Sequence, residues 1–191
     1  MNKINMRRED AIVVLIDAQE RLMPSMSDGA AMEAAVVKLV KGCRLMGVPI
    51  LVTQQYTKGL GPTITAVAEA LTAPVDGNAA SFSPIEKTAF SAMKEPAFVK
   101  ALGETNRTTV ILAGVEAHVC VLQTALHLVE AGYDVFAVLD CMSSRTIADK
   151  EFGQIRMAQS GVIVTGCETA LFELLEDAKD PCFKRISAIV K

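Results

Sequence analysis

Residues 108–129 constrain the fold of this chain more than any other part of its sequence. They open with a short apolar run at 110–113, which predicts a strand buried on both faces of a parallel sheet. The run breaks at Gly114, and apolar residues recur at helical spacing from about His118 onward. A strand, a turn and a helix in this order are typical of α/β folds, which bind their ligands at the carboxyl ends of the strands.

The turn between this strand and this helix leads to Cys120. A thiol near a helix N-terminus is close to the positive end of the helix dipole, which favours the thiolate and nucleophilic reactivity. A free cysteine is also commonly a small buried hydrophobic residue, so position alone leaves both interpretations open. Cys141 also follows a predicted strand, but no predicted helix begins there. We therefore expect Cys120 to be the most reactive thiol.

Predicted strands and helices alternate along the rest of the chain. Besides the central strand, strands are predicted at residues 11–16, 48–54, 83–88, 134–139 and 162–165. Helices are predicted at residues 30–46, 63–73, 95–102, 149–159, 169–175 and 181–190, and a loop at 55–62. Asp17 follows the first strand, where it is expected to cap a short helix with Glu20 in its first turn. The alternation predicts an α/β fold with a parallel sheet, in a single domain spanning residues 1–191.

Composition limits the class of protein. Hydrophobic residues make up 51% of the 191 residues, but no apolar run is long enough to span a bilayer, so a membrane protein is not expected. Strands covered by helices on both faces of a parallel sheet explain the high hydrophobic content. A subunit interface explains it as well, and on this ground we expect a homo-oligomer. The net charge of −3, with both signs scattered, gives no reason to expect a nucleic-acid partner.

Several kinds of functional motif are missing from the sequence. The five cysteines are irregularly spaced and form no CxxC pair, and the first ten residues contain no apolar segment of a secretory signal, so a reduced cytoplasm fits best. No glycine-rich dinucleotide or phosphate loop and no serine nucleophile elbow occurs. The only histidines, His118 and His127, lie nine residues apart and cannot form a histidine-rich metal site. We therefore expect no cofactor and no metal.

Three polar residues lie at or near predicted strand ends. Asp17 follows the first strand, Lys87 lies at the third, and Cys120 follows the central one. Because parallel strands end on the same side of a sheet, these side chains are expected to converge. Asp17 would then take the thiol proton, while Lys87 would favour the thiolate and orient Asp17. Singly, a helix cap explains Asp17 and a solvated lysine explains Lys87 equally well; the combination favours a catalytic site.

Three segments surround these residues: V-V-L-I-D-A-Q-E at Asp17, I-E-K-T-A-F-S at Lys87 and L-A-G-V-E-A-H-V-C-V at Cys120. With them the sequence resembles the isochorismatase-like cysteine hydrolases over nearly its whole length. The segments V-T-Q-Q-Y-T-K-G-L-G-P-T and L-D-C-M-S-S-R-T are similar to the isochorismatase-domain-containing branch, whose substrates are largely undefined.

This resemblance implies a three-layer, Rossmann-like α/β/α fold with a six-stranded parallel sheet, and a triad of Asp17, Lys87 and Cys120. It also implies a cis peptide bond between Val115 and Glu116. In the family this bond directs the N–H of Glu116, together with that of Cys120, at a developing oxyanion. The candidate substrate-pocket residues are Gln19, Gln54, Tyr56, Phe90 and His118, and a structural role for His118 is equally open.

Departures from particular family members narrow the expected reaction. Nicotinamidases have metal-binding aspartate and histidine residues after the second strand, whereas residues 54–59 contain neither. Isochorismate hydrolases of siderophore pathways lack the cysteine that this chain keeps as Cys120. The leading hypothesis is thus a metal-independent hydrolase that cleaves a C–N bond of a small amide or imide through a Cys120 thioester. The alternatives are vinyl-ether hydrolysis without covalent catalysis, and a non-catalytic oligomeric binding or scaffold protein, against which the intact triad argues.

Overall fold

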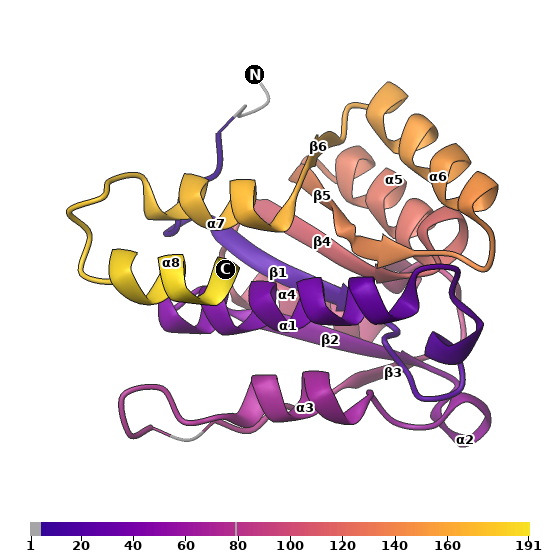
Figure 1. Ribbon diagram of the computed structural model, residues 1–191. Helices are drawn as coiled ribbons and strands as arrows, with labels where there is room; N and C mark the ends of the chain where they lie inside the picture. Colours follow the sequence, from indigo (N-terminus) through magenta and orange to yellow (C-terminus); the bar gives the residue numbers. More distant parts are fainter. Residues whose placement is uncertain (1–4, 79) are drawn as a thin grey trace.

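The computed structural model describes residues 5–78 and 80–191 (Figure 1). Its centre is one sheet of six parallel strands in the order β3-β2-β1-β4-β5-β6. The strands are β1 (Ala11–Ile16), β2 (Ile50–Gln55), β3 (Ile85–Lys87), β4 (Thr109–Val115), β5 (Asp134–Ser143) and β6 (Ile163–Thr165). The predicted α/β fold with a six-stranded parallel sheet is confirmed.

Helices cover both faces of this sheet and make a three-layer structure (Figure 1). They are α1 (Gly29–Leu45), α2 (Thr57–Leu60), α3 (Thr65–Thr72), α4 (Pro96–Glu104), α5 (Leu122–Glu130), α6 (Ile147–Gln159), α7 (Cys167–Leu175) and α8 (Phe183–Val190). Helices α1, α3, α7 and α8 pack on one face, and α4, α5 and α6 pack on the other. None of the described helices is both long enough and apolar enough to cross a membrane.

Strand β1 is buried on both faces because it lies between β2 and β4 under both helical layers. Val13 and Leu15 belong to the core beneath α1, whereas Ile12, Val14 and Ile16 belong to the core beneath α4 and α5. Each such side chain contributes about 1.5–3 kcal/mol of hydrophobic stabilisation when fully buried. The unbroken apolar run of β1 is the sequence pattern that this double burial requires.

Strand β5 is four residues longer than predicted and ends at Ser143 instead of residue 139. Its register with β4 passes from Leu112↔Ala137 to Gly114↔Met142, so β5 bulges while β4 advances by two residues. Within the bulge the carboxylate of Asp140 accepts a hydrogen bond of 2.8 Å from the backbone N–H of Cys167, at the start of α7. The polar Asp140 therefore interrupts the apolar pattern without ending the strand.

Gly114 allows β1 and β4 to approach each other closely at their carboxyl ends. Its φ of +120° lies in the range that disfavours side chains, and an added Cβ would lie 2.0 Å from the carbonyl oxygen of Ile16. The apolar run breaks at Gly114 in the sequence, but strand β4 continues through this glycine to Val115. Only Glu116 separates the strand from the turn that follows.

Two local predictions between β1 and α3 are wrong. Asp17 does not cap a helix: it has a φ of 49°, and the next helical turn is the 3₁₀ turn Met23–Ser25. The carboxylate of Asp17 instead bonds to side chains from β2 and β3, so it is not available to cap backbone N–H groups. The loop predicted at 55–62 contains the one-turn helix α2, which Gly61 ends with a φ of 79°.

Candidate active site

The candidate site lies at the carboxyl ends of β1 and β4, which are neighbours at the centre of the sheet (Figure 1). Strands β2 and β3 follow on one side of β1, and β5 and β6 on the other side of β4, so this is the topological switch point at which such sheets bind ligands. Asp17 directly follows β1. Cys120 lies in the π-helical turn Ala117–Val121, which follows β4 and precedes α5. Lys87 is the last residue of β3, and its long side chain reaches from the sheet edge beneath β2 to Asp17.

Asp17 and Lys87 form a fully buried ion pair. Lys87 Nζ lies 2.6 Å from Asp17 Oδ2, and neither side chain is exposed to solvent. The hydroxyl of Thr53 donates a hydrogen bond of 2.7 Å to the other oxygen, Asp17 Oδ1. Both carboxylate oxygens therefore accept a hydrogen bond, and the two donors hold the carboxylate in one orientation.

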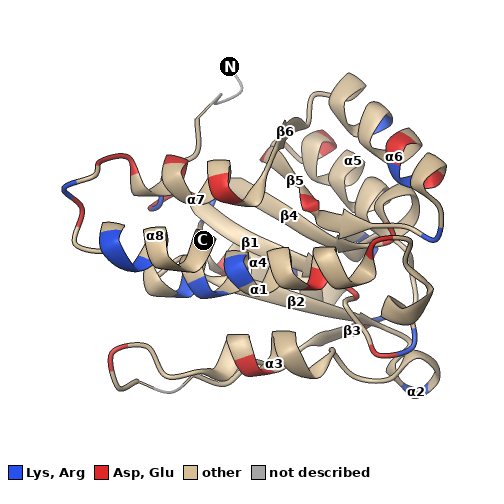
Figure 2. Ribbon diagram, viewed as in Figure 1, with Lys and Arg blue, Asp and Glu red and all other residues tan. Residues whose placement is uncertain are grey.

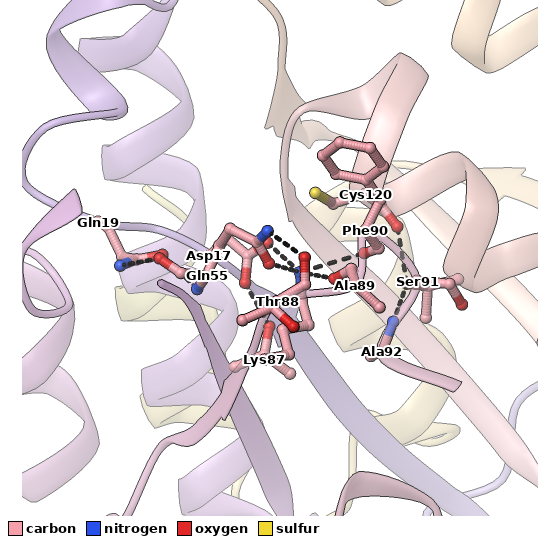
Figure 3. A network of polar contacts seen from close by, with 12 residues as sticks. Asp17, Gln19, Gln55, Lys87, Thr88, Ala89, Phe90, Ser91, Ala92 and Cys120 are labelled. Atoms are coloured by element: carbon pink, nitrogen blue, oxygen red, sulfur yellow. Dashed lines mark hydrogen bonds and ion pairs between the residues drawn. The ribbon is translucent and has the colours of Figure 1, made fainter. Parts of the chain in front are cut away.

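The ammonium of Lys87 has further acceptors besides Asp17 (Figure 3). It donates to Gln55 Oε1 at 2.9 Å and to the carbonyl oxygens of Phe90 at 3.1 Å and Ala89 at 3.3 Å. A buried ion pair repays the loss of hydration only when additional hydrogen bonds satisfy the charged groups. The three additional acceptors provide these hydrogen bonds for Lys87. Two of them, the carbonyl oxygens of Ala89 and Phe90, also hold the segment after β3 around the ammonium.

Cys120 is 8% exposed, and its thiol interacts electrostatically with both members of the ion pair. The pKa of Cys120 is raised to about 12, chiefly by burial and also by the negative charge of Asp17, while Lys87 opposes both effects. Lys87 lowers the pKa of the thiol, as predicted, but burial and Asp17 outweigh it, so the net shift is away from the thiolate. Cys120 is a protonated thiol next to a carboxylate, an arrangement in which attack requires transfer of the proton to a base.

The turn that holds Cys120 is fixed from both sides. The hydroxyl of Thr124 donates to the carbonyl oxygen of Cys120 at 2.7 Å and accepts from the N–H of Ala92 at 3.0 Å. Thr124 thereby joins the π-helical turn to the segment that follows Lys87. On the outer side, Gly153 of α6 packs so closely that an added Cβ would lie 2.7 Å from the carbonyl oxygen of Ala117.

Glu116 directly precedes the turn and His118 lies within it, and both bond toward the segment after β5. The peptide bond between Val115 and Glu116 is cis. The carboxylate of Glu116 pairs with the guanidinium of Arg145 at 2.9 Å. His118 Nδ1 lies 3.0 Å from the hydroxyl of Ser144, so the ring has a structural partner there. The roles predicted for these residues in an oxyanion hole and a pocket stay predictions.

The other predicted pocket residues fall into two groups. Gln19 is fully buried, and its side chain bonds to backbone groups of Gln55 and Gly61. Gln54 is nearly buried, and its amide donates to the hydroxyl of Thr63 at 2.9 Å. By contrast, Tyr56 and Phe90 are 53% and 54% exposed. Figure 3 shows Phe90 and Cys120 with the residues that surround the ion pair. The pocket role of all four residues stays a prediction.

Two residues that sequence reasoning missed belong to the polar network. Thr53 and Gln55 lie two positions apart on β2 and bond to Asp17 and Lys87, whereas Gln54 between them bonds on the other side. Side chains alternate between the faces of a strand, so this period of two was the available signal. Within residues 5–78 and 80–191, no group of three or more His, Cys, Asp or Glu side chains is placed to hold a metal ion.

The geometry of this site can be compared with known proteins. Residues 11–169, which include all of Asp17, Lys87 and Cys120, match the family model described as the Isochorismatase domain. The chain belongs to the isochorismatase family. It is thus a member of a hydrolase family, and the resemblance seen in the sequence is confirmed.

Relatives within the isochorismatase family align along most of the chain. It is 36% identical over 184 residues to isochorismatase domain-containing protein 2A of Mus musculus, and this alignment covers 96% of this chain and 84% of the relative. It is 39% identical over 176 residues to isochorismatase domain-containing protein 1 of Salmo salar, with 92% of this chain and 59% of the relative covered. The solved structure of MAR1 ribonuclease from Caenorhabditis elegans superposes with a TM-score of 0.89 at 32% identity, covering 97% of this chain and 92% of that one.

Proposed function

We propose that this protein is a metal-independent cysteine hydrolase that cleaves a C–N bond of a small amide or imide. One observation supports this above all: a buried, protonated Cys120 thiol lies against the carboxylate of Asp17, which Lys87 and Thr53 hold in place. A carboxylate at that position can accept the thiol proton during attack and return it to a leaving group. An inert core cysteine requires no such partner.

The proposed reaction begins when Cys120 Sγ attacks the carbonyl carbon of the substrate. The S–H proton passes to Asp17, a C–S bond forms, and the carbonyl electrons move onto oxygen. The tetrahedral intermediate collapses, the C–N bond breaks, and Asp17 protonates the leaving nitrogen. Water then attacks the thioester and gives a proton to Asp17, after which the C–S bond breaks and Asp17 reprotonates the sulfur. The net change is addition of one water to the amide.

The developing oxyanion requires hydrogen-bond donors aimed at it. We assign this role to the backbone N–H groups of Glu116, which directly precedes the turn after β4, and of Cys120, the fourth residue of that turn. Removing one donor of this kind typically costs roughly 3–4 kcal/mol of transition-state stabilisation. Lys87 acts on Asp17 and not on the substrate, because its ammonium is buried and surrounded by acceptors.

Two exposed aromatic residues form the proposed substrate-facing side of the site. The backbone N–H of Tyr56 donates to the carbonyl oxygen of Lys87 at 2.9 Å, and the carbonyl oxygen of Phe90 accepts from Lys87 Nζ. The backbones of both residues are therefore tied to Lys87, and about half of each residue is exposed. This favours a substrate with a small apolar part beside the scissile group.

A turnover screen tests the proposed function directly. Small aliphatic and aromatic amides are incubated with the protein and assayed for ammonia, while cyclic imides are assayed by the mass of the ring-opened product. Rapid quenching and intact-mass measurement should then find an acyl group on the wild-type chain and none on Cys120→Ala. Turnover that survives in Cys120→Ala within about tenfold would rule out covalent catalysis by this residue.

The same screen separates the two alternatives. Vinyl-ether hydrolysis proceeds without a covalent intermediate, so Cys120→Ser should largely keep that activity while losing amide turnover. A binding or scaffold protein would turn over no member of either class. Metal independence is tested by elemental analysis and by assays before and after chelation. One equivalent of bound zinc or iron, with activity lost on its removal, would contradict the metal-independent mechanism.

RNA hydrolysis is a separate outcome to check, because the similar C. elegans protein bears the name of a ribonuclease. We do not extend that activity to this chain, whose net charge is −3 and whose proposed nucleophile is 8% exposed. Labelled single-stranded RNA should remain intact with wild-type protein. Cleavage that disappears in Cys120→Ala would overturn the small-amide assignment.

A further inference from the structure

Three thiols that the proposed reaction does not use lie together in the core beneath α1. They are Cys43 of α1, Cys141 of β5 and Cys167, the first residue of α7, and all three are free. The thiol of Cys141 forms a hydrogen bond with Cys167, whereas Cys43 interacts with these two only through charge. Among the described residues no three His, Cys, Asp or Glu side chains are placed to hold a metal ion. The contact between Cys141 and Cys167 is therefore the feature to explain.

The backbone holds Cys141 and Cys167 next to each other. Strands β5 and β6 are parallel neighbours in which Val138 pairs with Thr165, and the two cysteines follow shortly after this pair. The carboxylate of Asp140, which directly precedes Cys141, accepts the hydrogen bond of 2.8 Å from the backbone N–H of Cys167. Neighbouring strands lie about 4.8 Å apart, and the Cα atoms of a disulfide usually lie about 4.4–6.8 Å apart. A bond between the two sulfurs therefore requires little movement of the backbone.

Cys167 is the member of the pair that is accessible from solvent. It is 4% exposed, whereas Cys141 is fully buried, and it lines a surface cavity of about 260 Å³ together with Ala35, Lys38 and Glu168. Its thiol donates to the carbonyl oxygen of Ala35 at 3.5 Å, so the sulfur lies beside the wall of this cavity. Figure 2 shows basic residues on α1 and acidic residues on α7, the helices that border the cavity. A water molecule occupies about 30 Å³, so a small, water-soluble hydroperoxide fits this space.

We propose that Cys141 and Cys167 form a site of reversible oxidation, at which a small hydroperoxide joins the two sulfurs in a disulfide. The sulfur of Cys167 attacks one oxygen of hydrogen peroxide, the O–O bond breaks, and a sulfenic acid and one water are formed. The sulfur of Cys141 then attacks the sulfenic sulfur, an S–S bond forms, and the S–O bond breaks. The hydroxyl group leaves with the proton of Cys141 as a second water. The peroxide gains two electrons and the two thiols lose them, and excess thiol reverses the bond by exchange.

The disulfide would join β5 to α7 on the face of the sheet opposite to Cys120. It closes a loop over residues 141–167, which contains α6 and β6, and so restricts the unfolded chain. Closing a loop of this length should raise the Tm by roughly 5–10 °C. Cys120 belongs to the core on the other face, so the proposal does not depend on the reaction that the protein catalyses.

Peptide mapping tests the pairing, because trypsin separates the relevant thiols. Cys141 lies in the tryptic peptide 108–145 and Cys167 in the peptide 157–179, whereas Cys43 lies in the peptide 42–44. Cys120 shares the peptide 108–145, so the Cys120→Ala chain is mapped beside the wild type, in which fragmentation locates the bond. After treatment with hydrogen peroxide and blocking of free thiols, the two peptides should be linked and the chain should be lighter by two hydrogen atoms. Dithiothreitol should reverse the link and the rise in Tm.

Variants of the Cys120→Ala chain assign a role to each thiol. Cys141→Ala should keep a sulfenic acid on Cys167 that dimedone labels, whereas Cys167→Ala should leave the buried Cys141 unlabelled. Cys43→Ala is the matched control and should keep both the link and the rise in Tm. Circular dichroism confirms that each variant is folded. In the wild type, a link from Cys167 to Cys43, a link between two chains, or thiols that stay free or pass to sulfinic acid without a link would overturn the proposal.

Discussion

Two buried thiols, on opposite faces of the same sheet, show what makes a cysteine a candidate nucleophile in this fold. Cys120 belongs to the core under α4 and α5, and Cys141 to the core under α1 and α7. In both, burial is the largest cause of a raised pKa. The next cause differs: for Cys120 it is the charge of Asp17, and for Cys141 it is a hydrogen bond with Cys167. The protonation state is therefore shared, and the nearby base distinguishes Cys120.

Substitution of each thiol by alanine gives the largest expected contrast. Cys120→Ala should lower kcat for the amide substrate by roughly 10⁵-fold or more, as removal of a covalent nucleophile does in other hydrolases. Cys141→Ala should leave kcat per folded molecule unchanged and cost about 1 kcal/mol of stability, because it leaves a small cavity in the core. Steady-state kinetics and urea unfolding measure both. Loss of activity in folded Cys141→Ala would reverse the assignment of the two thiols.

The order of strands and helices was predictable because it is set by local patterns. The buried run of β1 is apolar without interruption, and helix α1 ends at Leu45, two residues before Gly47, whose φ of +72° fits its predicted terminating role. The convergence of Asp17, Lys87 and Cys120 also followed from the sequence, because parallel strands end on one side. Family resemblance supplied the cis peptide bond, which no local pattern of residues 115–116 indicates.

The failures have a common physical cause, which is that long-range contacts decide where short-range patterns are ambiguous. Asp17 is of a residue type that commonly caps helices, but its carboxylate is paired with the ammonium of Lys87, 70 residues away in the sequence. Asp140 is of a residue type that commonly ends strands, but here it lies in the β5 bulge, where its carboxylate accepts a hydrogen bond from the N–H of Cys167. The thiolate expected at Cys120 depends on how deeply the thiol is buried, which a sequence does not contain. Burial and the charge of Asp17 outweigh the opposing effect of Lys87 on the pKa of this thiol.

Breaking the buried ion pair tests whether the surroundings of Cys120 are as constrained as their contacts indicate. Lys87→Met leaves the carboxylate of Asp17 buried without its counter-charge, which typically costs about 3–5 kcal/mol. The double variant Asp17→Asn/Lys87→Met removes both charges and should recover part of that stability, while neither variant turns over substrate. Urea unfolding provides the comparison. A double variant less stable than Lys87→Met alone would show that the pair is not the dominant interaction.

Alkaline stability examines the property that the two thiols share. A cysteine in the unfolded chain has an ordinary pKa of 9.0, whereas folded Cys120 keeps its proton up to about pH 12. Unfolding therefore releases a proton above pH 9, and this contribution to stability, complete below pH 9, falls as pH rises toward 12. The expected loss is about 1.4 kcal/mol per pH unit for each such thiol.

The variants Cys120→Ala and Cys141→Ala should each make the fall in stability between about pH 9 and about pH 10.5 less steep by a similar amount. Urea unfolding at a series of pH values measures this slope, and groups common to all three proteins cancel in the differences. A slope changed by Cys141→Ala but not by Cys120→Ala would mean that Cys120 ionises normally in the folded protein. The two thiols would then differ in pKa in the folded protein.

The smallest effect concerns the hydroxyl that orients Asp17, and a second buried threonine provides its control. Thr53 donates to Asp17 Oδ1 at 2.7 Å, whereas Thr109, at the opposite end of the sheet, has a buried hydroxyl without a hydrogen-bond partner among the described residues. Thr53→Val should lower kcat about tenfold with little change in KM, because the carboxylate loses one of its two donors. It should also cost about 1–2 kcal/mol of stability. Thr109→Val makes the same exchange of atoms but breaks no hydrogen bond, so it should be neutral or stabilising and leave kcat unchanged. Equal effects of the two substitutions on kcat would show that Thr53 contributes only to packing, and that Lys87 alone positions the base beside Cys120.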